Sequence, residues 1–373
     1  MRLPGGLGHL TYCTNIHPGE SWADCFAALA RHLPAIKRQV SPRAAFGVGL
    51  RLSAAAAATL SQAGELERFR AFLAAEDLYV FTINGFPYGA FHRTRVKEAV
   101  YRPDWRQPER RDYTARLAEI LAALLPDGID GSISTVPGAW AADLAGEADV
   151  AAIVAMLQDA ARRLAELEAR TGRRVTIALE PEPGCQLATT DDVLALFRRI
   201  PAAARRHIGV CLDLCHLAVE FEDPVAAVAQ LQAEEIPIFK VQISAGLALP
   251  PAQAQSLRPF DDGVYLHQVA ARGAGGILRF ADLADAWASA EAGAADEWRV
   301  HFHVPLWAER LERLSSTAGL AARLLAAHAA RPVCEHLEVE TYTWDVLAPE
   351  HRTCGVEAAI VKELLWVRDR LGV

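Results

Sequence analysis

The chain has 373 residues, 52% of them hydrophobic, so it can bury a large core, and its length suits one (β/α)8 barrel with insertions over residues 1–373 better than two barrels. Its formal net charge of -8, with acidic and basic residues interleaved, argues against a nucleic acid or a membrane surface as partner and favours a small molecule. The seven cysteines are scattered, which predicts reduced thiols. We find no apolar run typical of a signal peptide or long enough to span a bilayer, so we expect a cytoplasmic protein.

Short apolar or alternating runs recur along the chain, and helical stretches separate most of them, which is typical of parallel βα units. Some helix ends are readable: Ser21 and Asp24 form a capping box before one helix, and Gly172 stops the long helix 147–170. This order predicts an α/β protein with a (β/α)8 TIM barrel. The nine predicted strands begin at His9, Ala45, Leu78, Gly131, Val175, Ile208, Ile238, Val300 and His336.

One region breaks the alternation. Prolines and glycines punctuate a weakly periodic stretch between residues 248 and 297, which follows the seventh strand. We expect a long insertion at the barrel mouth, with bounds 248–310, that folds over it like a lid. The run VHFHVP from Val300 follows this stretch, so it is the candidate for the ninth strand, outside the barrel.

Polar residues stand at the ends of the last four barrel strands. Glu180 and Glu182 follow the fifth strand, and Asp213 ends the sixth, with His216 three residues later. The seventh strand presents Lys240, Gln242 and Ser244 on one face, and the last presents Glu338, Glu340 and Tyr342. Functional groups of such barrels lie where strands end and βα loops begin, so we expect these side chains to share one site.

Each of these residues also has a structural interpretation. Glu180 or Asp213 alone suits a helix cap or a salt bridge, Gln242 and His216 suit buried hydrogen bonds, and a lone H-x-H pair such as His301 and His303 is as often a surface feature. Together, however, three carboxylates and an imidazole would repel one another without a cation. Oxygen ligands favour Mg²⁺ or Mn²⁺, and the addition of His303 favours Zn²⁺ or Fe²⁺.

These strand ends resemble the xylose-isomerase-like barrel superfamily, whose sugar isomerases and epimerases bind a divalent metal through Glu, Asp, His and Glu on their last four strands. The matching positions are Glu180, Asp213, Gln242 and Glu340. Gln242 departs from the pattern, because a glutamine oxygen replaces the metal-bound histidine, and His303 or His216 would then supply the missing nitrogen. The ligand set that follows from the resemblance is Glu180, Asp213, Gln242, His303 and Glu340.

Within this superfamily, four segments together look like the EboE family of metabolite-traffic proteins, which is associated with export of secondary metabolites. They are LTYCTNIHPGESW, LEPEPG, HFHVPLW and LEVETYTW. The resemblance implies a small-metabolite ligand and transient protein partners of an export pathway, and it does not define a reaction.

Two functions follow as expectations. In an isomerase or epimerase, Glu180 and Glu340 would exchange a carbon-bound proton while His216 orients a substrate oxygen. The alternative is a binding or trafficking protein that keeps the barrel and the metal but turns nothing over. Phosphoester hydrolysis, as in DNA-repair endonucleases of the superfamily, is disfavoured by the acidic balance and the few histidines. The residues expected to bind substrate are Asn15, His17, Asn84, Glu182 and Glu338.

Overall fold

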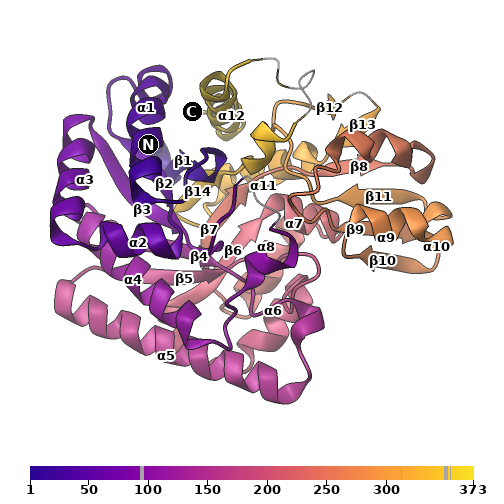
Figure 1. Ribbon diagram of the computed structural model, residues 1–373, viewed down its shortest axis with the longest axis horizontal. Helices are drawn as coiled ribbons and strands as arrows, with labels where there is room; N and C mark the ends of the chain where they lie inside the picture. Colours follow the sequence, from indigo (N-terminus) through magenta and orange to yellow (C-terminus); the bar gives the residue numbers. More distant parts are fainter. Residues whose placement is uncertain (93–95, 312, 348–351, 353) are drawn as a thin grey trace.

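The computed structural model describes residues 1–92, 96–311, 313–347, 352 and 354–373. Eight parallel strands form its central sheet, in the order β1-β14-β7-β6-β5-β4-β3-β2, and a bridge between Cys13 and Gly49 joins the two ends (Figure 1). The predicted (β/α)8 barrel is therefore confirmed. Its strands are β1 (His9–Tyr12), β2 (Phe46–Arg51), β3 (Leu78–Asn84), β4 (Gly131–Thr135), β5 (Val175–Leu179), β6 (Ile208–Asp213), β7 (Ile238–Ile243) and β14 (His336–Val339).

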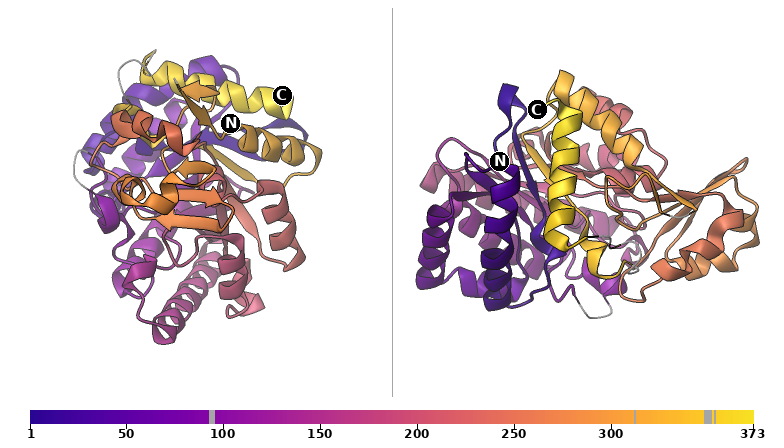
Figure 2. Two further views of the ribbon diagram at one scale, coloured as in Figure 1. Left: turned by 90° about the vertical axis from the view of Figure 1, so that its right-hand side faces the viewer. Right: turned by 90° about the horizontal axis from the view of Figure 1, so that it is seen from above.

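Helices cover the outside of the barrel, and α12 at the end of the chain lies beside α1 at its start (Figure 2). The Ser21 side chain accepts a hydrogen bond from the Asp24 backbone at the start of α1, and Gly172 ends α5 in a left-handed conformation. The helices of this layer are α1 (Trp22–Val40), α2 (Ala54–Leu60), α3 (Ala63–Ala75), α4 (Pro108–Leu124), α5 (Glu147–Thr171), α6 (Thr190–Phe197), α7 (Leu214–Val219), α8 (Pro224–Ala233), α11 (Ala318–Ala330) and α12 (Val356–Leu371).

A buried ion pair joins β7 and β14 inside the barrel. Lys240 Nζ lies 2.6 Å from Glu338 Oε2, and both side chains are fully buried, at 0% exposure. Gly49 on β2 leaves space for this carboxylate, because a Cβ there would lie 1.8 Å from Glu338 Oε1. Two residues further along the same strands come Gln242 and Glu340. Because side chains alternate along a strand, these two face the interior one layer nearer the mouth.

The insertion after β7 forms a sheet of its own. Its six antiparallel strands, in the order β10-β9-β11-β8-β13-β12, lie beside the barrel in Figure 1. They run from Leu247 to Ser316, further than the predicted 248–310, because β13 pairs with β8 and extends the sheet. The elements are β8 (Leu247–Leu249), β9 (Val269–Gly273), β10 (Gly276–Phe280), α9 (Leu283–Ala288), α10 (Ala290–Gly293), β11 (Glu297–Val300), β12 (Arg310–Leu311) and β13 (Leu314–Ser316).

The run VHFHVP lies outside the barrel, as expected, but it is not a strand along its length. Only Val300 belongs to β11, and residues 301–305 continue without strand pairing to the next turn. This segment brings His301 and His303 to the pocket at the barrel mouth. Across the described part of the chain, no helix is both long and apolar enough to cross a bilayer.

Candidate metal centre

Three carboxylates meet at the carboxyl ends of β5, β6 and β14. Asp213 is the last residue of β6, and Glu180 and Glu340 directly follow β5 and β14. One oxygen from each carboxylate lies within 4.8 Å of the other two, and the three residues are at most 4% exposed. Of the lysines and arginines in the described ranges, none forms an ion pair with any of the three. The structure therefore brings these three predicted residues together.

Burial and mutual repulsion shift the acidity of this cluster. Burial, reinforced by the charge of Asp213, raises the pKa of Glu180 well above its usual range. Burial, with the charges of Glu180 and Asp213, does the same to the pKa of Glu340. Burial also opposes ionisation of Asp213, but the adjacent His216 and His303, with hydrogen bonds from Ser244 and the His216 backbone, keep its pKa below the ordinary value. Such a set favours either protons or a cation.

Several oxygens of the cluster are left without a hydrogen-bond donor. Among the described residues, Glu180 Oε2, Asp213 Oδ2 and both amide atoms of Gln242 are buried and unpartnered. Asp213 and Gln242 are paired across β6 and β7. Buried polar atoms are rarely left unpaired, so these atoms form a set of donors suited to a ligand. Carboxylate and amide oxygens are suitable ligands for a hard divalent cation.

Three histidines lie next to the carboxylates, and their hydrogen bonds fix where their protons are. The Nδ1 atoms of His216, His301 and His303 lie 2.8, 2.7 and 2.9 Å from the Pro181 carbonyl, the Gln268 side-chain oxygen and the Glu340 carbonyl. These oxygens can only accept, so each Nδ1 carries a hydrogen and each neutral imidazole has its lone pair on Nε2. Metal-binding histidines are commonly held in this way.

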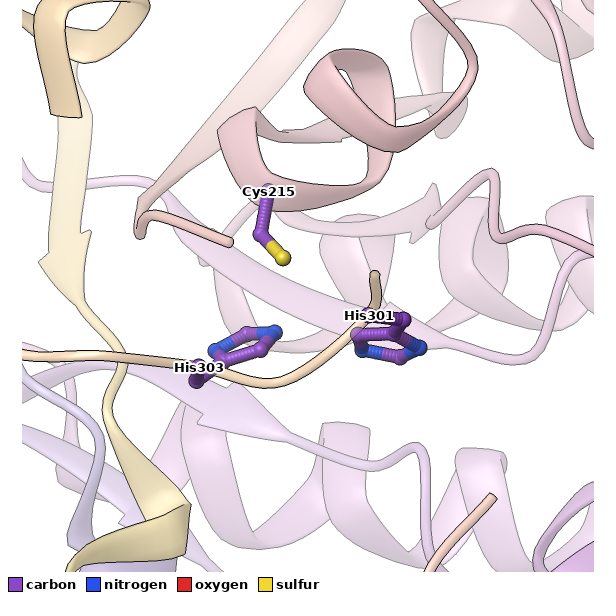
Figure 3. A group of neighbouring side chains, drawn as sticks. All are labelled: Cys215, His301 and His303. Carbon is purple, nitrogen blue, oxygen red and sulfur yellow. The ribbon is translucent and has the colours of Figure 1, made fainter. Parts of the chain in front are cut away.

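The Nε2 atoms of these histidines lie close to one another or to Asp213. His216 Nε2 lies 3.2 Å from His301 Nε2, and His303 Nε2 is unpartnered among the described residues, 4.0 Å from Asp213 Oδ2. Two imidazole nitrogens on one zinc ion lie roughly 3.3 Å apart, since each Zn–N bond is about 2.0–2.1 Å. Figure 3 shows Cys215 of α7 pointing toward His301 and His303, and one donor atom from each of the three lies within 4.8 Å of the others.

Burial favours the neutral form of two of these imidazoles, His216 and His301. It lowers the pKa of His216 to about 4 and that of His301 well below its usual range. Asp213 also groups with His216 and His303, so it connects the carboxylate and imidazole donors. The described residues therefore offer an oxygen-rich set of donors and a nitrogen-rich set that share one aspartate, and both fit a divalent cation.

A pocket opens above these donors and encloses about 550 Å³, part of it open to solvent. Of the predicted residues, Asn15, Asn84, Glu180, Glu182, His216, His303 and Glu340 line it. Asn15 and Asn84 have a second contact, because their amides donate to Glu340 Oε1 at 2.8 and 3.0 Å. They hold this carboxylate in one orientation.

Two residues predicted to bind substrate lie elsewhere. His17 accepts or donates a 2.9 Å hydrogen bond with Tyr12 and stacks on His32, so it faces α1 instead of the pocket. Glu338 lies below the pocket, in the ion pair with Lys240. Strand alternation alone could not separate Glu338 from Glu340, because both point inward at different depths.

The structure adds pocket residues that the sequence pattern did not identify. His301 lines the pocket, and its spacing from His303 was the available signal. Tyr101 donates to Glu182 Oε1 at 2.7 Å, and Gln268 donates to Tyr101 at 2.8 Å. Burial, against these donors, raises the pKa of Glu182 to about 8. No sequence motif marks Tyr101, which ends a short 3-10 helix, or Gln268, which precedes β9, since both lie far along the chain from the ends of the barrel strands.

The fold and site define a class. A family profile described as xylose isomerase-like TIM barrel matches residues 47–284, and the chain belongs to this family. A comparison with curated protein sequences gave no match.

Solved structures share the fold. A xylose isomerase-like TIM barrel protein from Mycobacterium smegmatis, in complex with magnesium, is 12% identical, with a TM-score of 0.56 over 98% of this chain and 96% of that one. A D-allulose 3-epimerase from Methylomonas sp. is 13% identical, with a TM-score of 0.53 over 97% of both chains. A D-psicose 3-epimerase is 12% identical, with a TM-score of 0.53 over 98% of this chain and 100% of that one. At these identities the likeness shows the fold alone.

Proposed function

We propose that the chain is a divalent-metal-dependent isomerase or epimerase of a small hydroxy-carbonyl metabolite. The observation that carries the proposal is the cluster of Glu180, Asp213 and Glu340, buried together without a lysine or arginine partner in the described chain. Similar barrels include D-allulose and D-psicose 3-epimerases and a protein in complex with magnesium. The metal ligands would be Glu180, Asp213 and Glu340, with Gln242 and His303 as further donors.

The residues around the cluster suit proton transfer. When bound, a divalent cation supplies Lewis-acid polarisation of a substrate oxygen. Glu180 and Glu340 come from non-adjacent strands of the barrel, so one carboxylate can remove a proton from the carbon next to a carbonyl and the other can return one from the opposite side. Asn15 and Asn84 orient Glu340 for this task. His216, whose Nε2 faces the pocket, would orient a substrate oxygen.

Gln242 favours a second candidate function. It occupies the place of the metal-bound histidine in the isomerases and epimerases that the sequence resembles, and an amide oxygen is a weaker ligand than imidazole. The alternative is therefore a metabolite-binding protein without turnover. In either case we propose, from the resemblance to the EboE family, that the protein acts in the cytoplasm and delivers its metabolite to transient partners of an export pathway.

Metal binding tests the proposal first. The full-length protein, stripped with a chelator, should bind Mn²⁺ in a calorimetric titration, and Asp213→Asn and Glu340→Gln should each weaken binding at least about tenfold. Glu363→Gln is the matched control, because Glu363 is also a buried glutamate, but it accepts hydrogen bonds from Thr341 and the Leu306 backbone and belongs to none of the described groups of metal donors. A stripped protein that takes up no divalent ion would refute the metal site.

Deuterium exchange then separates the two functions. An epimerase should incorporate solvent deuterium next to the carbonyl of a ketose such as D-allulose, and Glu340→Gln should slow this by about 10²–10⁴-fold. A carrier would show no exchange in wild type, and Glu340→Gln would change only metal or ligand affinity. Exchange that persists in Glu340→Gln would assign the proton transfer to another residue.

A further inference from the structure

The pocket has two unlike halves. Its floor is polar and consists of the carboxylates and imidazoles described above, with Asn15 and Asn84. Its walls come from the loop after β3, from the insertion and from the segment after β14, and they are largely apolar. The wall residues are Phe86, Pro87, Phe91, Val96, Val100, Tyr101, Tyr265, Leu266 and Tyr342.

Aromatic rings from three distant segments meet in the wall. The ring centroids of Phe91, Tyr265 and Tyr342 lie 5.1–5.4 Å apart in all three pairs. Val96 packs against them, and Phe91, Val96 and Tyr265 are 6–7% exposed. The polar end of Tyr265 is already used, since its hydroxyl donates to the Phe91 carbonyl at 3.3 Å. These side chains therefore offer a ligand their apolar surfaces.

The described part of the wall carries no lysine or arginine that is free of an ion pair. Among the described residues that line the pocket, Lys97 is the only lysine or arginine, and its Nζ forms an ion pair with Asp282. Asp282 also caps α9 and accepts from the His267 backbone, so it is held in place. A phosphate group is normally bound by free basic side chains or by backbone amides at a helix start. Among the residues whose placement is described, the walls offer no such free side chain for a sugar phosphate.

We propose that the ligand is a neutral, unphosphorylated molecule with two ends. Its head carries adjacent oxygen atoms, hydroxyl or carbonyl, that face the floor. Its body is an apolar ring that packs against Phe91, Val96, Tyr265 and Leu266. A free hexose fits less well, because its far hydroxyls would lie against apolar side chains, and a buried hydroxyl without a hydrogen-bond partner is unfavourable. This inference rests on the proposed function.

The test uses the full-length protein loaded with Mn²⁺ and three ligands that share a hexose head. Calorimetry compares phenyl β-D-glucopyranoside, methyl β-D-glucopyranoside and glucose 6-phosphate. We expect the phenyl glycoside to bind at least about tenfold more tightly than the methyl glycoside, since it adds one buried ring, and glucose 6-phosphate to bind no more tightly than the methyl glycoside.

Substitutions in the wall test whether the preference for the phenyl glycoside arises there. Phe91→Ser should reduce the phenyl preference to less than about threefold, and Val96→Ser, a smaller change, should reduce it in part and serves if the first variant does not fold. Phe72→Ser on α3 is the control, because Phe72, like Phe91, packs against two aromatic rings, but these are Phe26 and Phe69, outside the pocket. Its preference should equal that of wild type.

The outcomes are distinguishable. Equal binding of the two glycosides, or tightest binding of glucose 6-phosphate, by a protein that has taken up Mn²⁺ would overturn the ligand class and leave the proposed function intact. A protein that takes up no Mn²⁺ but prefers the phenyl glycoside would refute the metal-dependent function and still support the apolar body of the ligand.

Discussion

Two layers of the barrel interior differ in whether their buried carboxylates have a lysine partner. In the lower layer, Glu338 of β14 has its own lysine, Lys240 of β7, at 2.6 Å. In the upper layer, two residues further along the same strands, Glu340 and Gln242 have no cationic side chain against them in the described chain. Glu180 and Asp213 from neighbouring strands join this upper layer. The same two strands thus carry a neutralised layer and a layer with excess negative charge.

This difference in charge pairing indicates a different role for each layer. An ion pair within the barrel satisfies itself and needs nothing from outside, although it stabilises a fold less than its Coulomb attraction suggests. The Glu338 charge, against the effect of burial, raises the pKa of Lys240 above its ordinary value. The upper carboxylates instead raise one another's pKa, so a cation from outside is the natural partner. The lower layer is structural, and the upper layer is suited to binding.

The largest expected effect tests this contrast directly. Glu338→Gln should lower the free energy of unfolding by about 3–5 kcal/mol, because it leaves the Lys240 ammonium buried and unpaired. Glu340→Gln in the metal-free protein should change it little or raise it, because it removes one of three mutually repelling carboxylates. Its new side chain can still accept from Asn15 and Asn84. Urea unfolding in a chelator measures both.

A double substitution is the control for the lower layer. Lys240→Met combined with Glu338→Gln removes both charges, so it should recover part of the stability lost in Glu338→Gln. If Glu338→Gln and Glu340→Gln destabilise the metal-free protein equally, the two layers do not differ in the way described.

The next largest effect is a loss of stability expected for a substitution at Gly49. Gly49→Ala would place a Cβ 1.8 Å from Glu338 Oε1 and 2.7 Å from the Tyr12 carbonyl, so the ion pair or the strand must shift. We expect a loss of about 1–3 kcal/mol in unfolding free energy. Gly64→Ala is the matched control, because Gly64 lies in α3 with nothing within 4 Å of an added Cβ, and the change should be neutral or stabilising by up to about 1 kcal/mol. Similar losses at both positions would show that the Glu338 contact is unimportant.

The sequence predicted the barrel and the centre of the site because both follow from local rules. Alternation of strands and helices defines the fold, and functional side chains of such barrels lie at strand ends, as Glu180, Asp213 and Glu340 do. Strand alternation does not give the depth of a side chain inside the barrel, so the sequence analysis places Glu338 and Glu340 in one site. The sequence also does not indicate that the loop of His17 turns toward α1. Tertiary packing determines where Tyr101, Gln268 and Tyr265 lie. The hydrophobic periodicity of the sequence does not contain this information.

The last effect, the smallest for any single group, is a pH dependence that reports on the upper layer. Burial raises the pKa of Glu182 to about 8 and of Glu363 to about 7, and it raises those of Glu180 and Glu340 well above their usual range. Between the unfolded value of about 4.5 and these values, the folded protein holds more protons than the unfolded chain, so its stability falls as pH rises. Buried histidines with lowered pKa act oppositely, but only below about pH 6.5.

The net fall should therefore appear between about pH 6.5 and 8, at about 1.4 kcal/mol per pH unit for each extra proton held. Urea unfolding of the chelator-treated protein across this range measures it, and Glu363→Gln should remove only the share of one carboxyl outside the cluster. Saturating Mn²⁺ should flatten the slope further, because a cation replaces protons on Glu180 and Glu340 and stabilises the folded state that binds it. A slope that is the same with and without Mn²⁺ would mean that the upper layer keeps its protons and is, like the lower one, complete without an ion.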